Sequence, residues 1–231
     1  MANSNDKIRV WDIPVRLFHW ALVILITTSY FSGRAGGDWM QLHFYSGYSI
    51  LTLLLFRIAW GFIGSTTARF SHFVKGPSAA FHHLAELAGT DRPRDVGHNP
   101  LGGAMVMVLI FAVLAQVIAG LFAADTDMGT VNGPLTRLVS DKFIDKATAF
   151  HGFWINVLLI LIGVHVLAAI VYLVWKRQNL IGAMITGSKP IDDCVPPGKP
   201  APKLQFASGR LAISLLIACA AVVYFIVRLG G

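Results

Sequence analysis

The sequence predicts an all-α integral membrane protein, built as a bundle of five spanning helices. Hydrophobic residues make up 55% of its 231 residues and charged residues only 13%, whereas soluble domains are about 25% charged. Five apolar segments each approach the ~20 residues that a spanning helix needs. These segments cover approximately 15–33, 42–64, 101–124, 149–175 and 209–229. Little of the chain remains for a second, soluble domain.

The residues around the apolar segments indicate where each element begins and ends. Pro14 and Pro100 stand at the start of the first and third segments, and proline suits the first turn of a helix. The N-terminus resembles a signal peptide, but no small-x-small cleavage site stands out, so we expect a retained first helix. Residues 77–87 favour a short interfacial helix. We expect a polar loop over 125–148 and a flexible, proline-rich tether over 187–204.

The distribution of lysine and arginine predicts the orientation in the membrane. If the chain alternates sides from its N-terminus, thirteen of the nineteen basic residues fall on the first side and five on the opposite side. The remaining one, Arg57, lies within a helix. We therefore expect the N-terminus on the inside and the C-terminus on the outside. The net charge of +7 follows from this asymmetry and requires no nucleic-acid partner.

Four histidines lie within or at the ends of the apolar segments, where an ionisable side chain marks a functional site by default. His151 and His165 are fourteen residues apart on one predicted helix. They therefore share a face and lie ~21 Å apart along its axis. Given the orientation, His19 matches the depth of His165 toward the inside, and His43 matches His151 toward the outside. The sequence thus predicts a pair of imidazoles near each membrane face.

Two imidazoles that face each other within a helical bundle are the ligand set of a haem iron. Zinc also binds imidazole, but four ligands at two depths cannot surround one ion. A proton relay is a further alternative, although it would not need histidines repeated on one face. Any one histidine taken alone is more often an ordinary interfacial residue. The two depth-matched pairs favour haem.

Other residues could support bound haem. Arg57 follows His43 by fourteen residues on the same face, so it could bind haem propionates at the inner depth. It could equally snorkel to the inner surface. Arg34 and Arg16 could bind propionates at the outer and inner rims. Gly47, one turn from His43, would permit close approach of a flat macrocycle, although glycine is also common at plain helix–helix contacts.

The other four histidines are expected to be solvated rather than to act as ligands; they are His72, His82, His83 and His98. A disulfide is not expected, because Cys194 lies in a polar loop and Cys219 in an apolar run. The sequence contains no C-x-x-C-H motif, which excludes covalent c-type haem by the usual attachment signal.

Several stretches resemble the prokaryotic cytochrome b561 family, which includes the cytochrome b subunits of nickel–iron hydrogenases. The resemblance covers about residues 8–188, and the spaced histidines are its most specific part. The stretches are VWDIPVRLFHW at 10–20, HFYSGYSILTLLLFRIAWGFIG at 43–64, GHNPLGG at 97–103, AGLFAADTD at 119–127 and HGFWINVLLILIGVHVLAAIVY at 151–172.

The resemblance implies a four-helix dihaem domain over residues 1–188. Residues 189–231 would add a proline-rich tether and a fifth C-terminal transmembrane helix outside that core. The family's ligands to two b-type haems fall on the histidines already paired by depth, which are His19, His43, His151 and His165. We expect the chain in the bacterial inner membrane, with a cytoplasmic N-terminus and a periplasmic C-terminus as the lysine and arginine distribution predicts.

Two haems at different depths would carry electrons across the lipid bilayer. The first expectation is electron transfer between the quinone pool and a periplasmic partner such as a c-type cytochrome. The alternative is a membrane anchor cytochrome b subunit of a hydrogenase or another periplasmic oxidoreductase. A haem or metal transporter belongs to a different class, and the sequence shows neither a broken helix nor a polar path across the membrane. A structural scaffold would make the histidine pairing an accident.

Overall fold

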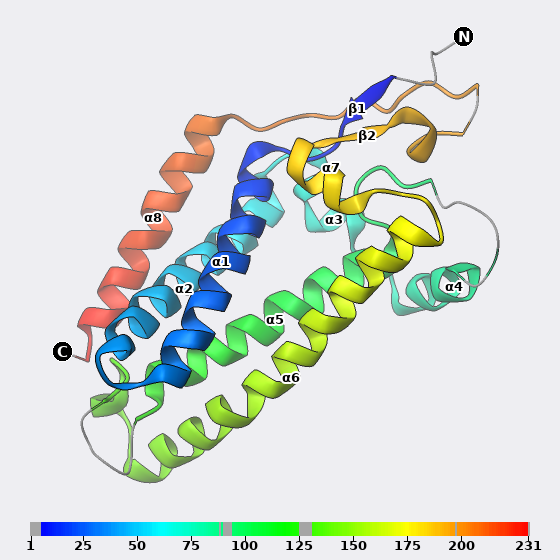
Figure 1. The fold of residues 1–231 in the computed structure, drawn as a ribbon. Coiled ribbons are helices and arrows are strands. Elements are labelled where there is room, and N and C mark those ends of the chain that lie inside the picture. The colour runs from blue at the N-terminus through cyan, green and yellow to red at the C-terminus, as the bar shows by residue number, and fades with distance from the viewer. Residues whose placement is uncertain (1–5, 88, 90–93, 125–130, 197, 231) are drawn as a thin grey trace. The chain divides into compact units, whose positions relative to one another are not determined.

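Five long helices make up most of the chain (Figure 1). The structure, a computed structural model, describes residues 6–87, 89, 94–124, 131–196 and 198–230. The long helices are α1 Ile13–Ala35, α2 Met40–Ile63, α5 Pro100–Phe122, α6 Asp141–Val174 and α8 Gly209–Arg228. Each is long and apolar enough to cross a membrane. The predicted all-α, multi-pass membrane architecture is therefore confirmed.

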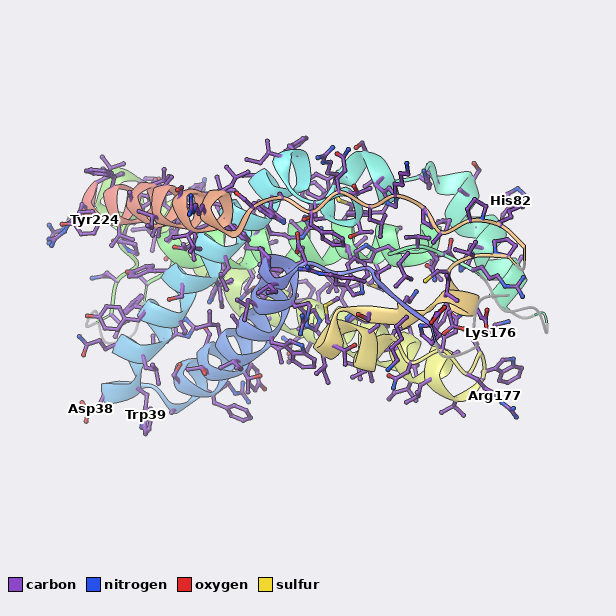
Figure 2. The ribbon with its side chains drawn as sticks, turned by 90° about the horizontal axis from the view of Figure 1, so that it is seen from above. Asp38, Trp39, His82, Lys176, Arg177 and Tyr224 are labelled. Carbon is purple, nitrogen blue, oxygen red and sulfur yellow. The ribbon has the colours of Figure 1, made fainter. Side chains whose placement is uncertain are left out.

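Large apolar side chains remain exposed on these helices. Phe31 on α1, Phe153 on α6 and Phe225 on α8 are 66%, 64% and 66% exposed. Such surface is unfavourable in water but not against lipid tails. Trp39 and Tyr224 are also exposed and are labelled in Figure 2, where the Trp39 ring projects away from the ribbon. Aromatic side chains of this kind are typical of the membrane–water interface.

The fourth long helix begins earlier than predicted. We expected it to start near 149, after a polar loop over 125–148, but α6 already begins at Asp141. An acidic residue in the first turn stabilises a helix through its dipole. Phe143 also contacts Phe122 edge-on, with ring centroids 5.4 Å apart. The polar residues therefore extend the helix, while 125–130 lies outside the described residues.

The shorter elements include one confirmed prediction and one correction. The predicted short helix is present as α4 Pro77–Leu87. The predicted flexible tether is partly wrong, because it begins with an ordered strand, β2 Ser188–Pro190, which pairs antiparallel with β1 Lys7–Arg9. Pairing satisfies backbone donors and acceptors that a free tether would leave to water. The remaining short helices are α3 Phe70–Phe73 and α7 Leu180–Thr186.

The chain divides into two compact units, and each long helix contributes a segment to both. The first unit comprises residues 1–17, 58–108 and 162–212. The second comprises residues 18–57, 109–161 and 213–231. The division interleaves the predicted 1–188 and 189–231 regions, whose boundary stays a prediction.

A buried aspartate organises the start of α1 in the first unit. Asp12 is only 2% exposed and caps the helix, because Oδ1 accepts a hydrogen bond of 2.8 Å from the Val15 N–H. Its other oxygen, Oδ2, accepts a 2.9 Å bond from Trp60 Nε1 on α2. The W-D-I-P stretch therefore acts as a helix start that is attached to a second helix.

Histidine burial in the first unit differs from the prediction. His83 was expected to be solvated, but it is 5% exposed and its Nε2 lies 2.8 Å from the Tyr172 hydroxyl. Asn99 Nδ2 donates to the same hydroxyl at 2.6 Å. His83 is therefore hydrogen-bonded to α6, where the sequence predicted that it would be exposed to solvent. Its neighbour His82 is exposed, as expected, and is labelled in Figure 2.

The second unit is held by contacts between α5 and α6. Trp154 Nε1 donates a 2.9 Å hydrogen bond to the carbonyl of Ala112. Farther toward the start of α6, Thr148 Oγ1 accepts a 3.0 Å bond from the N–H of Ala124, which follows the end of α5 at Phe122. These bonds fix the rotation of α6 about its axis in this unit, and with it the direction of the side chains between them.

Candidate functional site

The second unit brings two of the predicted ligands close together. His43 lies one turn after the start of α2, and His151 lies on α6. Their ring centroids are 6.1 Å apart, and the ring planes are at 89° to each other. A metal ion binds an imidazole nitrogen at about 2 Å, so an ion midway between two imidazoles separates their ring centres by about 6 Å. The spacing therefore suits one metal ion between the rings.

Each imidazole is oriented by a backbone carbonyl of a neighbouring helix. His43 Nδ1 donates to the Ser29 carbonyl on α1 at 2.8 Å, and the Ser29 hydroxyl lies 3.2 Å from the same nitrogen. His151 Nδ1 donates to the Gln116 carbonyl on α5 at 2.9 Å. A carbonyl can only accept, so Nδ1 carries a proton in both rings, and in the neutral imidazole the lone pair is then on Nε2. This is the tautomer that a metal-binding imidazole needs.

A cavity of about 340 Å³ surrounds the two rings within the second unit. This volume falls in the range of small-molecule and cofactor sites, about 300–1,000 Å³. The walls are mostly apolar side chains of α1, α2, α5 and α6. Polar groups are few, and they include Arg34, Gln116 and Asn156. The site is therefore a mostly apolar cavity that contains two imidazoles and has one cation, Arg34, at its wall.

Two further observations fit a bound planar group. Gln116 is 8% exposed, and no donor among the described residues reaches its Oε1. A buried polar atom of this kind in a cavity wall points to an unshown partner, such as a ligand or water. Gly47 also lines the cavity, and a Cβ built there would meet nothing within 4 Å. The lining thus fits a haem between His43 and His151.

The other predicted pair is not brought together within one unit. His19 lies on the part of α1 that belongs to the second unit, and His165 lies on the part of α6 that belongs to the first. Both side chains are half-buried. Their pairing around a second haem stays a prediction.

The three predicted arginines occupy different surroundings. Arg34 is exposed and lines the cavity, with its guanidinium 6.0 Å from the centre of the Tyr30 ring. Arg57 is 2% exposed, on the α2 segment of the second unit. In the first unit, Arg16 donates to the carbonyls of Met184 and Ile185 near the end of α7. Arg34 alone of the three lines the described cavity, and all three propionate roles stay predictions.

Sequence reasoning missed four residues that orient the imidazoles. Ser29 and Gln116 supply the accepting carbonyls, and Gly33 and Gly120 lie against the rings. One signal was available, because a glutamine within an apolar spanning helix is a candidate functional residue. The glycines carried no such signal, since the sequence does not say which helix they face.

Comparison with known proteins places the chain in a family. Residues 10–187 match the family described as prokaryotic cytochrome b561. A relative from Rhizobium leguminosarum bv. viciae, described as "Probable Ni/Fe-hydrogenase B-type cytochrome subunit", is 25% identical over 223 residues, covering 83% of this chain and 92% of the relative. A relative of the same description from Azotobacter chroococcum is 28% identical, covering 83% of this chain and 95% of its own length.

A relative from Escherichia coli K12 matches over a shorter stretch. The protein described there as "Probable Ni/Fe-hydrogenase 1 B-type cytochrome subunit" is 28% identical over 149 residues, covering 52% of this chain and 63% of its own length. No solved structure matches the chain. The family match covers most of the chain and includes His19, His43, His151 and His165. This chain belongs to the prokaryotic cytochrome b561 family and is a multi-pass membrane b-type cytochrome that transfers electrons.

Proposed function

We propose that this chain is the membrane cytochrome b subunit of a nickel–iron hydrogenase and passes electrons between that enzyme and the quinone pool. The descriptions of its relatives support this alternative over a c-type cytochrome as the redox partner. The coverage supports it as well, because the match extends over 92% and 95% of two of those relatives. Membrane lipid surrounds the spanning helices.

The observation that carries the proposal is the 6.1 Å separation of the His43 and His151 ring centroids within a mostly apolar cavity. Bound haem supplies one-electron redox chemistry at its iron. His43 and His151 would hold the haem through their Nε2 atoms, and two histidine ligands would leave the iron no position for oxygen. The carbonyls of Ser29 and Gln116 hold both rings in the ligating tautomer. The residues thus favour electron transfer over oxygen chemistry.

A second haem, held by His19 and His165 at the inner depth, would complete a path across the membrane. The proposed roles of the arginines are to neutralise propionates, with Arg34 at the outer haem and with Arg57 and Arg16 at the inner haem. Gly47 would allow the outer macrocycle to approach α2. We place the chain in the bacterial inner membrane, with its N-terminus cytoplasmic and its C-terminus periplasmic, on the basis of the lysine and arginine distribution.

The ligand assignment is tested by haem content and redox titration of the purified protein. The unaltered chain should contain two b haems, both low-spin and titrating in two steps. His43→Ala and His151→Ala should each remove the same haem and spare the other. His82→Ala, at an exposed histidine on α4, should retain both haems. Retention of both haems in His43→Ala or His151→Ala would contradict the assignment.

The partner is tested in membranes that contain the associated hydrogenase. Hydrogen should reduce the haems of the unaltered chain, and added quinone should reoxidise them. Removing the hydrogenase should abolish the reduction by hydrogen. If reduction instead requires a c-type cytochrome and does not respond to hydrogen, the hydrogenase role is wrong and the first expectation from the sequence is restored.

A further inference from the structure

We propose that Gly33 and Gly120 are positioning residues that set the reduction potential of the haem held by His43 and His151. The proposal rests on the proposed function, because it requires those two histidines to be haem ligands. Each glycine leaves room for an imidazole to reach a carbonyl of a neighbouring helix. The size of the residue at positions 33 and 120 therefore controls the strength of the hydrogen bonds between the two imidazoles and their carbonyls.

The geometry follows from the spacing of an α-helix. The carbonyl of residue i faces the N–H of residue i+4, so these two residues share one patch of the helix surface. Gly33 follows Ser29 by four residues, and Gly120 follows Gln116 by four. A carbonyl oxygen has two lone pairs and can accept a second hydrogen bond from a neighbouring helix. The donor must then approach over the residue at i+4.

Both imidazoles approach by this route. A Cβ added at Gly33 would lie 2.7 Å from His43 Nδ1, the atom that donates to Ser29. A Cβ added at Gly120 would lie 2.9 Å from Cε1 and 3.2 Å from Nδ1 of His151, which donates to Gln116. Contacts below 3.0 Å force something to shift, and each ring is held between its carbonyl and the cavity. Alanine at either position would move the imidazole off its acceptor.

The same arrangement occurs twice in the second unit. Helix α1 supplies the carbonyl and glycine for the histidine of α2, and helix α5 supplies them for the histidine of α6. General helix packing also uses glycine in membranes. Packing alone does not explain why both glycines contact the ring that donates to the carbonyl four residues earlier. This repetition is the reason to assign them a role in ligand positioning.

The hydrogen bonds affect the iron through the basicity of its ligands. An Nδ1–H···O=C bond gives the imidazole more negative character and makes Nε2 a stronger ligand. A more basic imidazole ligand stabilises ferric iron more than ferrous iron, and it therefore lowers the reduction potential of the haem. A tenfold loss of ferric relative to ferrous binding, the lower end of the effect of losing such a partner, raises the potential of a one-electron couple by about 59 mV.

The test compares Gly33→Ala and Gly120→Ala with the unaltered holoprotein by redox titration and by electron paramagnetic resonance of the ferric haems. Gly209→Ala is the matched control, because a Cβ there meets nothing within 4 Å and the residue lies outside the cavity lining. Gly33→Ala and Gly120→Ala should each raise the potential of one of the two haems by about 59 mV, or should release that haem and keep the other. The second potential and the control should stay unchanged.

The outcomes separate this inference from the proposed function. If both glycine variants keep both potentials, or lose both haems together with their helical signal, the glycines serve packing and the inference is wrong. The His43→Ala variant is measured alongside them. If it loses one haem while the glycine variants titrate normally, only the inference fails. If it keeps both haems, the ligand assignment itself fails.

Discussion

Replacing Gln116 by leucine should stabilise the haem-free chain. The side chain is 8% exposed, and no donor among the described residues reaches its Oε1. Leaving a buried acceptor without a hydrogen bond costs about 1–3 kcal/mol. Leucine removes that atom and replaces the amide by an apolar side chain of similar size. The accepting backbone carbonyl stays, so His151 should keep its orientation.

The substitution also removes two contacts of Gln116 Nε2. This atom donates to the His151 carbonyl at 3.1 Å, and a net hydrogen bond of this kind contributes about 0.5–1.5 kcal/mol. The same atom lies 3.4 Å from His151 Nε2, beyond the usual hydrogen-bond distance, so this second contact adds little. The difference between the two effects is a gain of about 1 kcal/mol. For a chain of 231 residues, this raises the melting temperature by roughly 2–4 °C.

The assay is thermal unfolding in detergent of protein expressed without haem, followed by circular dichroism. Gln41→Leu is the control, at an exposed glutamine on α2, where the change should remain within about 0.5 kcal/mol. Destabilisation of Gln116→Leu by 1 kcal/mol or more would refute the reasoning, because it would mean that ordered water or another group satisfies Oε1. A stabilised variant would identify Gln116 as a residue retained for function at the expense of stability.

Two further predictions concern charged residues. Burial lowers the pKa of Lys189, which is 5% exposed on β2, with Nζ donating to the Asp95 carbonyl at 3.2 Å. Because the folded state binds the proton less tightly than the unfolded state, stability should rise as pH climbs from the lowered pKa to the ordinary 10.5. Lys189→Met should abolish that rise in urea unfolding followed as a function of pH, and an unchanged slope would contradict it. Arg34→Gln should lower the outer haem potential by less than about 59 mV, because loss of a positive charge disfavours the reduced state and exposed pairs are weak. Arg137→Gln, at an exposed arginine away from the cavity lining, is the control in the same redox titration, and an equal shift in both would remove Arg34 from the propionate role.

Most of the fold could be predicted from composition and periodicity. Apolar segments long enough to span a bilayer leave helices as the structure that satisfies the backbone, so all five were found. The early start of α6 at Asp141 was missed, because a helix continues beyond the hydrocarbon core without any apolar signal. The strand at Ser188–Pro190 was missed because its partner lies at the other end of the chain.

The histidine contacts, like the fold, could be predicted from the sequence only in part. The pairing of His43 with His151 was predicted from depth alone, since helix rise and chain direction determine depth. The burial of His83 against Tyr172 was not predicted, because the contact joins residues 89 apart in the sequence. Depth matching cannot distinguish a ring that faces a neighbouring helix from one that faces water.

The sequence by itself determined the membrane architecture and the position of each of the four histidines along its helix. Hydropathy over a span of ~20 residues and the fixed rise per residue are local properties of the chain. Only the tertiary structure decided which carbonyls hold the imidazoles and why positions 33 and 120 are glycine. Those contacts depend on which helices are neighbours and on the rotation of each helix about its axis. Rotation is set by packing between helices, and no stretch of sequence contains it alone.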